Sequence, residues 1–127
     1  MLVQVKVSLG ELVDKLTILA IKSEKITDPE KLKHVKREFD ELKRTLDELN
    51  LEGIHEHFDE LKKINEELWV IEDDIRDKER DKEFDETFIK LARAVYVTND
   101  QRFGAKARCN ERYGSELQEV KSYQKYD

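Results

Sequence analysis

The feature that most constrains this chain is an apolar residue at every third or fourth position through long stretches without glycine or proline. The clearest stretch carries the apolar residues Leu32, Val35, Phe39, Leu42, Leu46 and Leu49. Because an α-helix turns once in about 3.6 residues, this spacing places all of them on one face. Charged residues fill most other positions, so the stretch is predicted to be an amphipathic helix that covers a core with one face.

Three other stretches show the same periodicity, and local signals indicate where each helix begins and ends. Ser8 and Glu11 match a capping box, Asp28 and Asp85 are further N-terminal caps, and Gly114 follows the last helix. The predicted helices cover about residues 9–26, 28–49, 54–80 and 85–113. Long helices with short breaks favour an antiparallel bundle of about four helices, or a pair of helical hairpins, in a single domain over residues 1–127.

The two ends of the chain follow different patterns. Residues 2–7 alternate apolar and polar side chains, with Val3, Val5 and Val7 on one side, which predicts a short N-terminal strand. The predicted fold class is therefore all-α with one short strand. Residues 115–127 carry few apolar side chains and are expected to form a tail that docks on the helices. The unpaired edge of the strand, together with the long apolar seams, predicts a homodimer.

The charge of the chain excludes several classes of partner. Charged residues make up 43% of the chain, with 30 acidic and 24 basic residues and a net charge of -6. A dedicated nucleic-acid-binding domain needs a basic face, so nucleic acid is not expected as a partner. No apolar run approaches the roughly 18 residues that span a bilayer, so no membrane partner is expected. The single cysteine, Cys109, allows no intrachain disulfide, which predicts a reducing, cytoplasmic setting.

Several charged or amide side chains lie close to the apolar stripes, where partners or a ligand must satisfy them. In the third predicted helix, Asn65 and Glu72 interrupt the apolar spacing. Glu72 and Arg76, and likewise Arg102 and Lys106, are four residues apart and share a helix face. The candidate ligand-binding residues are Lys15, Lys22, Glu72, Arg76, Arg93, Asn99, Arg102 and Lys106.

This polar set has two interpretations. Opposite charges on the third and fourth helices could form ion pairs that fix the register of the bundle. Alternatively, the cations could bind a small anion or a substrate, with Glu72 as acid or base. No glycine-rich phosphate loop, zinc motif or nucleophile motif is present, so no cofactor and no metal site are predicted. Whether the chain is an enzyme stays open at this point.

Four runs of the sequence resemble a family of small helical proteins of unknown function. They are GELVDKLTILAIK at 10–22, NEELWVIEDDIRDKE at 65–79, FDETFIKLARAVYVTNDQR at 84–102 and YGSELQEVKSY at 113–123. Members of that family occur in bacteria and phages, sometimes beside glycosyltransferase genes. The resemblance therefore implies a role near glycan or nucleotide-sugar metabolism.

Two functional hypotheses follow. The leading hypothesis is a non-enzymatic helical interaction or accessory module that binds a partner protein or a second copy of itself. The alternative is a helical enzyme or small-anion binder that uses the interior Lys, Arg and Glu cluster. An open pocket lined by those residues would favour the alternative, whereas charges that pair with one another would favour the first hypothesis.

Overall fold

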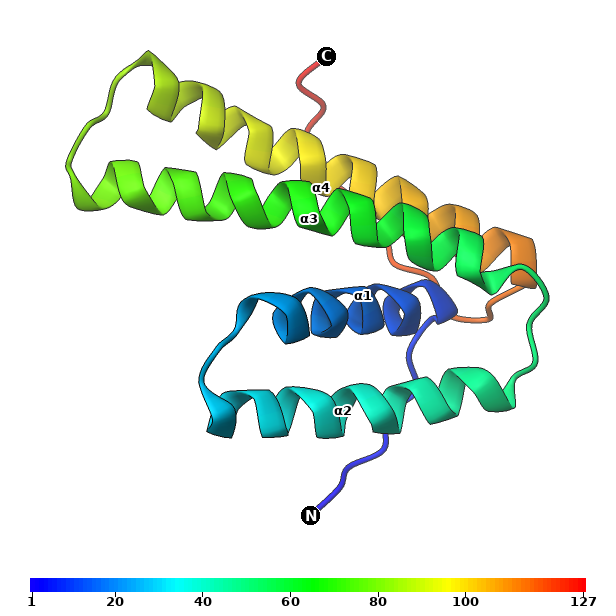
Figure 1. The fold of residues 1–127 in the computed structure, drawn as a ribbon. Coiled ribbons are helices and arrows are strands. Elements are labelled where there is room, and N and C mark those ends of the chain that lie inside the picture. The colour runs from blue at the N-terminus through cyan, green and yellow to red at the C-terminus, as the bar shows by residue number, and fades with distance from the viewer.

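The computed structural model describes residues 1–127, which form four helices and no strand. The helices are α1 (Leu9–Lys25), α2 (Pro29–Glu48), α3 (Ile54–Arg80) and α4 (Glu86–Tyr113). The prediction of an all-α fold with four long helices is confirmed. Figure 1 shows two helical hairpins, α1 with α2 and α3 with α4, stacked on each other through α1.

The helix ends follow from local chemistry that the sequence already indicates. The Ser8 hydroxyl accepts a hydrogen bond from the backbone N–H of Glu11 at 3.2 Å, which caps α1. The Asp28 and Asp85 carboxylates cap α2 and α4 in the same way. Gly114 ends α4 with φ 65°, a left-handed conformation that glycine adopts without a steric penalty.

The predicted N-terminal strand is wrong. Residues 1–8 form neither helix nor strand, and Leu2, Val3 and Val5 are 73%, 76% and 73% exposed. A strand needs a neighbouring backbone to accept and donate its hydrogen bonds, and no second strand exists in this chain. The segment instead leaves α1 and ends beyond α2, away from α3 and α4 (Figure 1).

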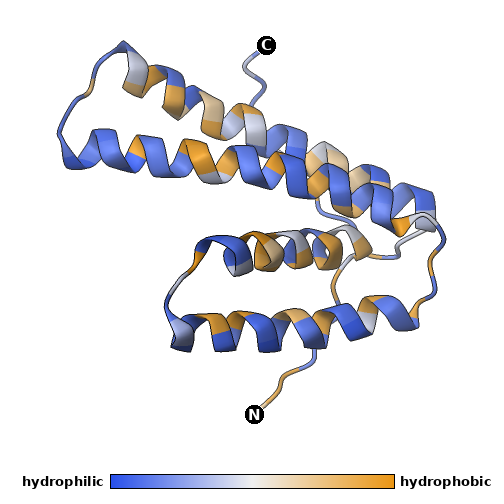
Figure 2. Ribbon diagram, viewed as in Figure 1, coloured by the Kyte–Doolittle hydropathy of each residue, from blue (hydrophilic) through white to orange (hydrophobic).

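The first helix is the centre of the molecule. α1 packs on each of the other three helices, whereas α2 packs on α1 alone. Figure 2 shows that α1 carries a large share of apolar residues, while hydrophilic residues predominate along α2 and α3. The buried core cluster consists of Leu12, Val13, Leu16, Leu46, Leu61, Ala105 and Cys109.

The first turn of α1 crosses α4 at very short range. The backbone N–H of Gly10 donates to Oδ1 of Asn110 at 2.6 Å. A Cβ atom at position 10 would lie 2.6 Å from the carbonyl oxygen of Lys106, so only glycine fits without moving the helices apart. This close approach brings the polar side chains of α1 and α4 within reach of each other.

Candidate functional site

The centre of the polar interior is Asp14 of α1, whose side chain is 0% exposed. Arg102 of α4 donates to it twice, from Nε to Oδ1 at 2.9 Å and from Nη2 to Oδ2 at 2.5 Å. Asn65 of α3 donates from Nδ2 to Oδ1 of Asp14 at 2.9 Å and to Oγ1 of Thr17 at 2.8 Å. One buried carboxylate therefore joins three helices.

This arrangement satisfies the charge of Asp14 inside the protein. A buried carboxylate is costly unless it is paired and fully hydrogen-bonded, and a bidentate arginine meets both needs. The hydrogen bonds to Asp14 in turn raise the pKa of Arg102 above the ordinary value of a guanidinium. The two hydrogen bonds from Arg102 to Asp14 fix α4 against α1.

Lys106 lies one turn further along α4 and forms a second cluster. Its side chain is 10% exposed, and its Nζ atom lies 2.6 Å from Oε2 of Glu119 and 3.4 Å from Oε2 of Glu11. Glu11 belongs to α1, but Glu119 belongs to residues 115–127, the segment that follows α4 without helix or strand. We call this segment the C-terminal tail.

The C-terminal tail is held on the helices by polar contacts along its length. Near its start, the Ser115 hydroxyl accepts a hydrogen bond from the backbone N–H of Leu9 at 3.2 Å. Further on, Lys121 and the Tyr126 hydroxyl both donate to the Asp100 carboxylate at 2.8 Å. These two bonds lower the pKa of Asp100 below the ordinary value of an aspartate. The tail therefore has charged or polar anchors at both of its ends.

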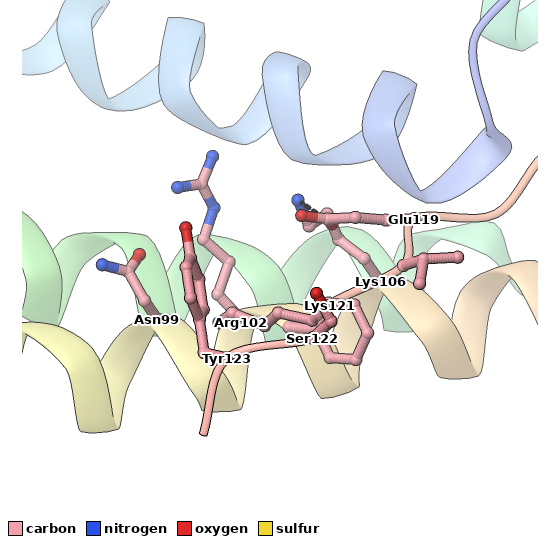
Figure 3. Close-up of a pocket in the computed structure, with 9 residues that line it drawn as sticks. Asn99, Arg102, Lys106, Glu119, Lys121, Ser122 and Tyr123 are labelled. Atoms are coloured by element: carbon pink, nitrogen blue, oxygen red, sulfur yellow. Dashed lines mark ion pairs between the residues drawn. The ribbon is translucent and has the colours of Figure 1, made fainter. Parts of the chain in front are cut away.

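A pocket of about 430 Å³ lies between the C-terminal tail and α4. Figure 3 shows Arg102 reaching from α4 toward α1, the ion pair of Lys106 with Glu119, and Tyr123 of the tail beside Asn99. The pocket is lined by Asn99, Arg102, Phe103 and Lys106 of α4 and by Glu119, Val120, Lys121, Ser122 and Tyr123 of the tail. We call it the tail pocket.

Arg102 also lines a second pocket, of about 380 Å³, at the side of α3 that faces α1. Its apolar wall includes Ile18, Ile21 and Trp69. Glu72 of α3 lines it as well, and this carboxylate forms an ion pair with Arg76 one turn further along the same helix. The second pocket is thus mainly apolar, with one ion pair at its edge.

The structure brings together some of the candidate residues predicted from the sequence and separates others. Asn99, Arg102 and Lys106 line the tail pocket, and Glu72 and Arg76 share the second pocket with Arg102. Lys15 and Arg93 are exposed and Lys22 is half-buried, and none of these three residues lines either pocket.

Two residues that the structure places at the centre of the site were not among the candidate ligand-binding residues predicted from the sequence. Asp14 is recognisable from the sequence as a polar residue beside an apolar stripe, within the run from Leu12 to Leu19, but it was not predicted to bind a ligand. Glu119 was not a candidate either, because no periodicity indicates where an irregular tail returns to the helices. The direction of pairing differs as well, since Arg102 pairs with α1 and not with α3.

Two other kinds of group in the chain have reactive or metal-binding chemistry. Cys109 is fully buried, and burial raises the pKa of its thiol to about 11, so the thiolate is scarce at neutral pH. The structure contains no group of three or more His, Cys, Asp or Glu side chains placed to hold a metal ion.

None of the four helices has the length and apolar character that a bilayer crossing requires. Neither the curated proteins nor the solved structures contain a match to the chain. A family model matches residues 3–126, and the chain therefore belongs to a family of unknown function, DUF6165.

Proposed function

We propose that this protein is a non-enzymatic helical interaction module that self-associates through its N-terminal segment, residues 2–7. The observation that carries the proposal is the exposure of Leu2, Val3 and Val5 next to backbone groups that no element of the chain pairs. Apolar side chains beside unpaired backbone are a template for pairing with another chain. The occupant we assign is a second copy of this chain.

The sequence of the segment suits pairing with itself around a two-fold axis. An antiparallel arrangement that places Val5 opposite Val5 of the second copy also places Val3 opposite Val7 and Gln4 opposite Lys6. The valines then share one face, and no lysine lies opposite another lysine. This complementarity explains why a period-two pattern is present in a chain that cannot pair it internally.

The polar interior supports a structural role for the Asp14 network. Arg102 is held by Asp14, and Lys106 is held by Glu11 and Glu119, so these cations close on carboxylates of the same chain. Such a network positions helices against one another and presents a rigid body to a partner. An accessory role beside enzymes of glycan or nucleotide-sugar metabolism is implied by the resemblance alone and stays a prediction.

The test is the mass of the protein in solution. Sedimentation velocity across a wide range of protein concentration should show a species of twice the monomer mass of 15.1 kDa. Val5→Asp should restore the monomer, because it would place two carboxylates opposite each other at the two-fold axis. Val120→Asp is the matched control, since Val120 is also exposed, on the other terminal segment, and it should leave the dimer intact.

Two results would contradict the proposal. One is a wild-type protein that stays at 15.1 kDa at every concentration. The other is a dimer that Val5→Asp leaves unchanged, because association would then use another surface.

A further inference from the structure

Lys106 has an unusual set of partners for a buried cation. Among the cations that form ion pairs in this chain, it has the most buried side chain. Its short contact, at 2.6 Å, is with Glu119 of the C-terminal tail, whereas Glu11 of the neighbouring helix lies at 3.4 Å. The nearest counter-charge of the most buried ammonium group therefore comes from outside the four helices.

The C-terminal tail is held in a way that allows it to open. Val120 and Tyr123 are exposed, so the tail buries little apolar surface, and each of its ion pairs with the helices has one exposed carboxylate, Glu119 or Asp100. Segments with few buried apolar contacts and exposed hydrogen bonds open at a small free-energy cost. Opening withdraws Glu119 and leaves the helical core as it is.

With Glu119 withdrawn, α4 presents a set of prearranged donors. Asn99, Arg102 and Lys106 are three and four residues apart and lie on one face of the helix. Asp14 binds Nε and Nη2 of Arg102, which fixes the guanidinium and leaves Nη1 for another acceptor. A donor held in place by a buried carboxylate loses little entropy when a ligand binds.

We propose that the tail pocket is a binding site for a phosphate-bearing small molecule, and that the Glu119 carboxylate occupies the position of the ligand's phosphate when the site is empty. A ligand must displace an intramolecular carboxylate, so a second carboxylate would gain nothing by the exchange. A phosphate carries up to two charges and three acceptor oxygens, which suits Lys106 and Nη1 of Arg102 together. The volume of about 430 Å³ is in the range of small-molecule sites.

The test is calorimetric titration of the full-length protein with inorganic pyrophosphate. Glu119→Gln removes the competing carboxylate and should tighten binding about tenfold, as expected when the competent state is about a tenth of the population. Glu116→Gln is the matched control, because Glu116 is an exposed acid of the same tail without an ion pair, and it should bind like the wild type. Lys106→Met should abolish binding.

Acetate at matched ionic strength separates phosphate from carboxylate recognition. It should not compete with pyrophosphate, and competition at equal concentration would overturn the assignment of ligand class. Equal affinities for Glu119→Gln and Glu116→Gln, or no binding to either wild type or Glu119→Gln, would overturn the site itself. These comparisons hold even if Lys106→Met fails to fold, since residue 119 lies outside the helices. The site does not depend on self-association, which the pyrophosphate titration does not measure.

Discussion

Arg102 and Lys106 lie one turn apart on the same helix, yet their charges are neutralised in opposite ways. The partner of Arg102 is Asp14, which is fully buried on the central helix. The close partner of Lys106 is Glu119, whose side chain is 43% exposed on the tail. One face of α4 thus carries one cation that is paired within the helical core and a second that is paired mainly with the C-terminal tail. The difference lies in the partner, because both cations are largely buried.

The largest expected effect is on the core side of this comparison. Arg102→Met leaves the buried Asp14 carboxylate without a counter-charge, and it should lower the free energy of unfolding by about 3–5 kcal/mol. The measurement is the urea denaturation midpoint. Arg108→Met is the control, since Arg108 pairs with Glu60 at the surface and should cost less than about 1 kcal/mol. An unchanged midpoint for Arg102→Met would contradict the claim that the Asp14–Arg102 pair stabilises the core.

The crossing of α1 and α4 ranks second. Gly10→Ala places a Cβ 2.6 Å from a backbone oxygen, so the helices must separate, at a cost of about 1–3 kcal/mol. Gly104→Ala in α4 is the control, because its Cβ would meet only the flexible end of Arg108 at 3.3 Å. That control should be neutral or slightly stabilising, since alanine favours helix. Equal midpoints for both variants would show that the crossing tolerates a methyl group.

Lys106→Met sharpens the comparison, because it makes the same substitution one turn away from Arg102. Glu119 and Glu11 are both partly exposed and stay hydrated when they lose Lys106. The free energy of unfolding should therefore fall by less than about 1 kcal/mol. Urea denaturation of the two methionine variants side by side checks the ratio. A loss for Lys106→Met as large as for Arg102→Met would contradict the distinction between core and tail partners.

The smallest effect concerns the pH dependence of the tail. The pKa of Asp100 is lowered in the folded protein. The stabilisation that Asp100 gives to the docked tail is therefore fully present above the ordinary pKa of an aspartate, and it is lost as pH falls through the lowered value. The contacts of Tyr126 with Asp100 and Tyr96 should therefore weaken only in acid. Nuclear Overhauser contacts between the two tyrosine rings report this. Asp100→Asn should remove the transition, and a wild-type tail that stays docked through the whole acid range would contradict it.

The parts of the fold that were predictable from sequence are those set by neighbours along the chain. Ser8, Asp28 and Asp85 begin their helices, and Gly114 ends α4, through contacts within a few residues. The local sequence therefore indicates where these helices begin and end. The N-terminal strand failed because pairing depends on residues far away or on another molecule. Local alternation in residues 2–7 has no means of supplying that partner.

The candidate site likewise contains residues that the local sequence pattern indicates and residues that it does not. Asn99, Arg102 and Lys106 were recognisable as a set because they share one helix face. Asp14 is 88 residues from its partner Arg102 in the sequence, and Glu119 is 13 residues from its partner Lys106. Which distant carboxylate reaches which cation depends on the crossing at Gly10 and on the path of the tail, and neither has a periodic signature.

The crossing at Gly10 also has a kinetic consequence. Where a helix approaches the backbone of another this closely, a rotamer change cannot adjust their separation, so we expect α1 and α4 to keep a fixed spacing. Arg102 and Lys106 of α4 then keep their positions relative to α1 whether the tail is closed or open. The rate at which any ligand enters the tail pocket would be set by the opening of residues 115–127 and would be insensitive to motions of the helices.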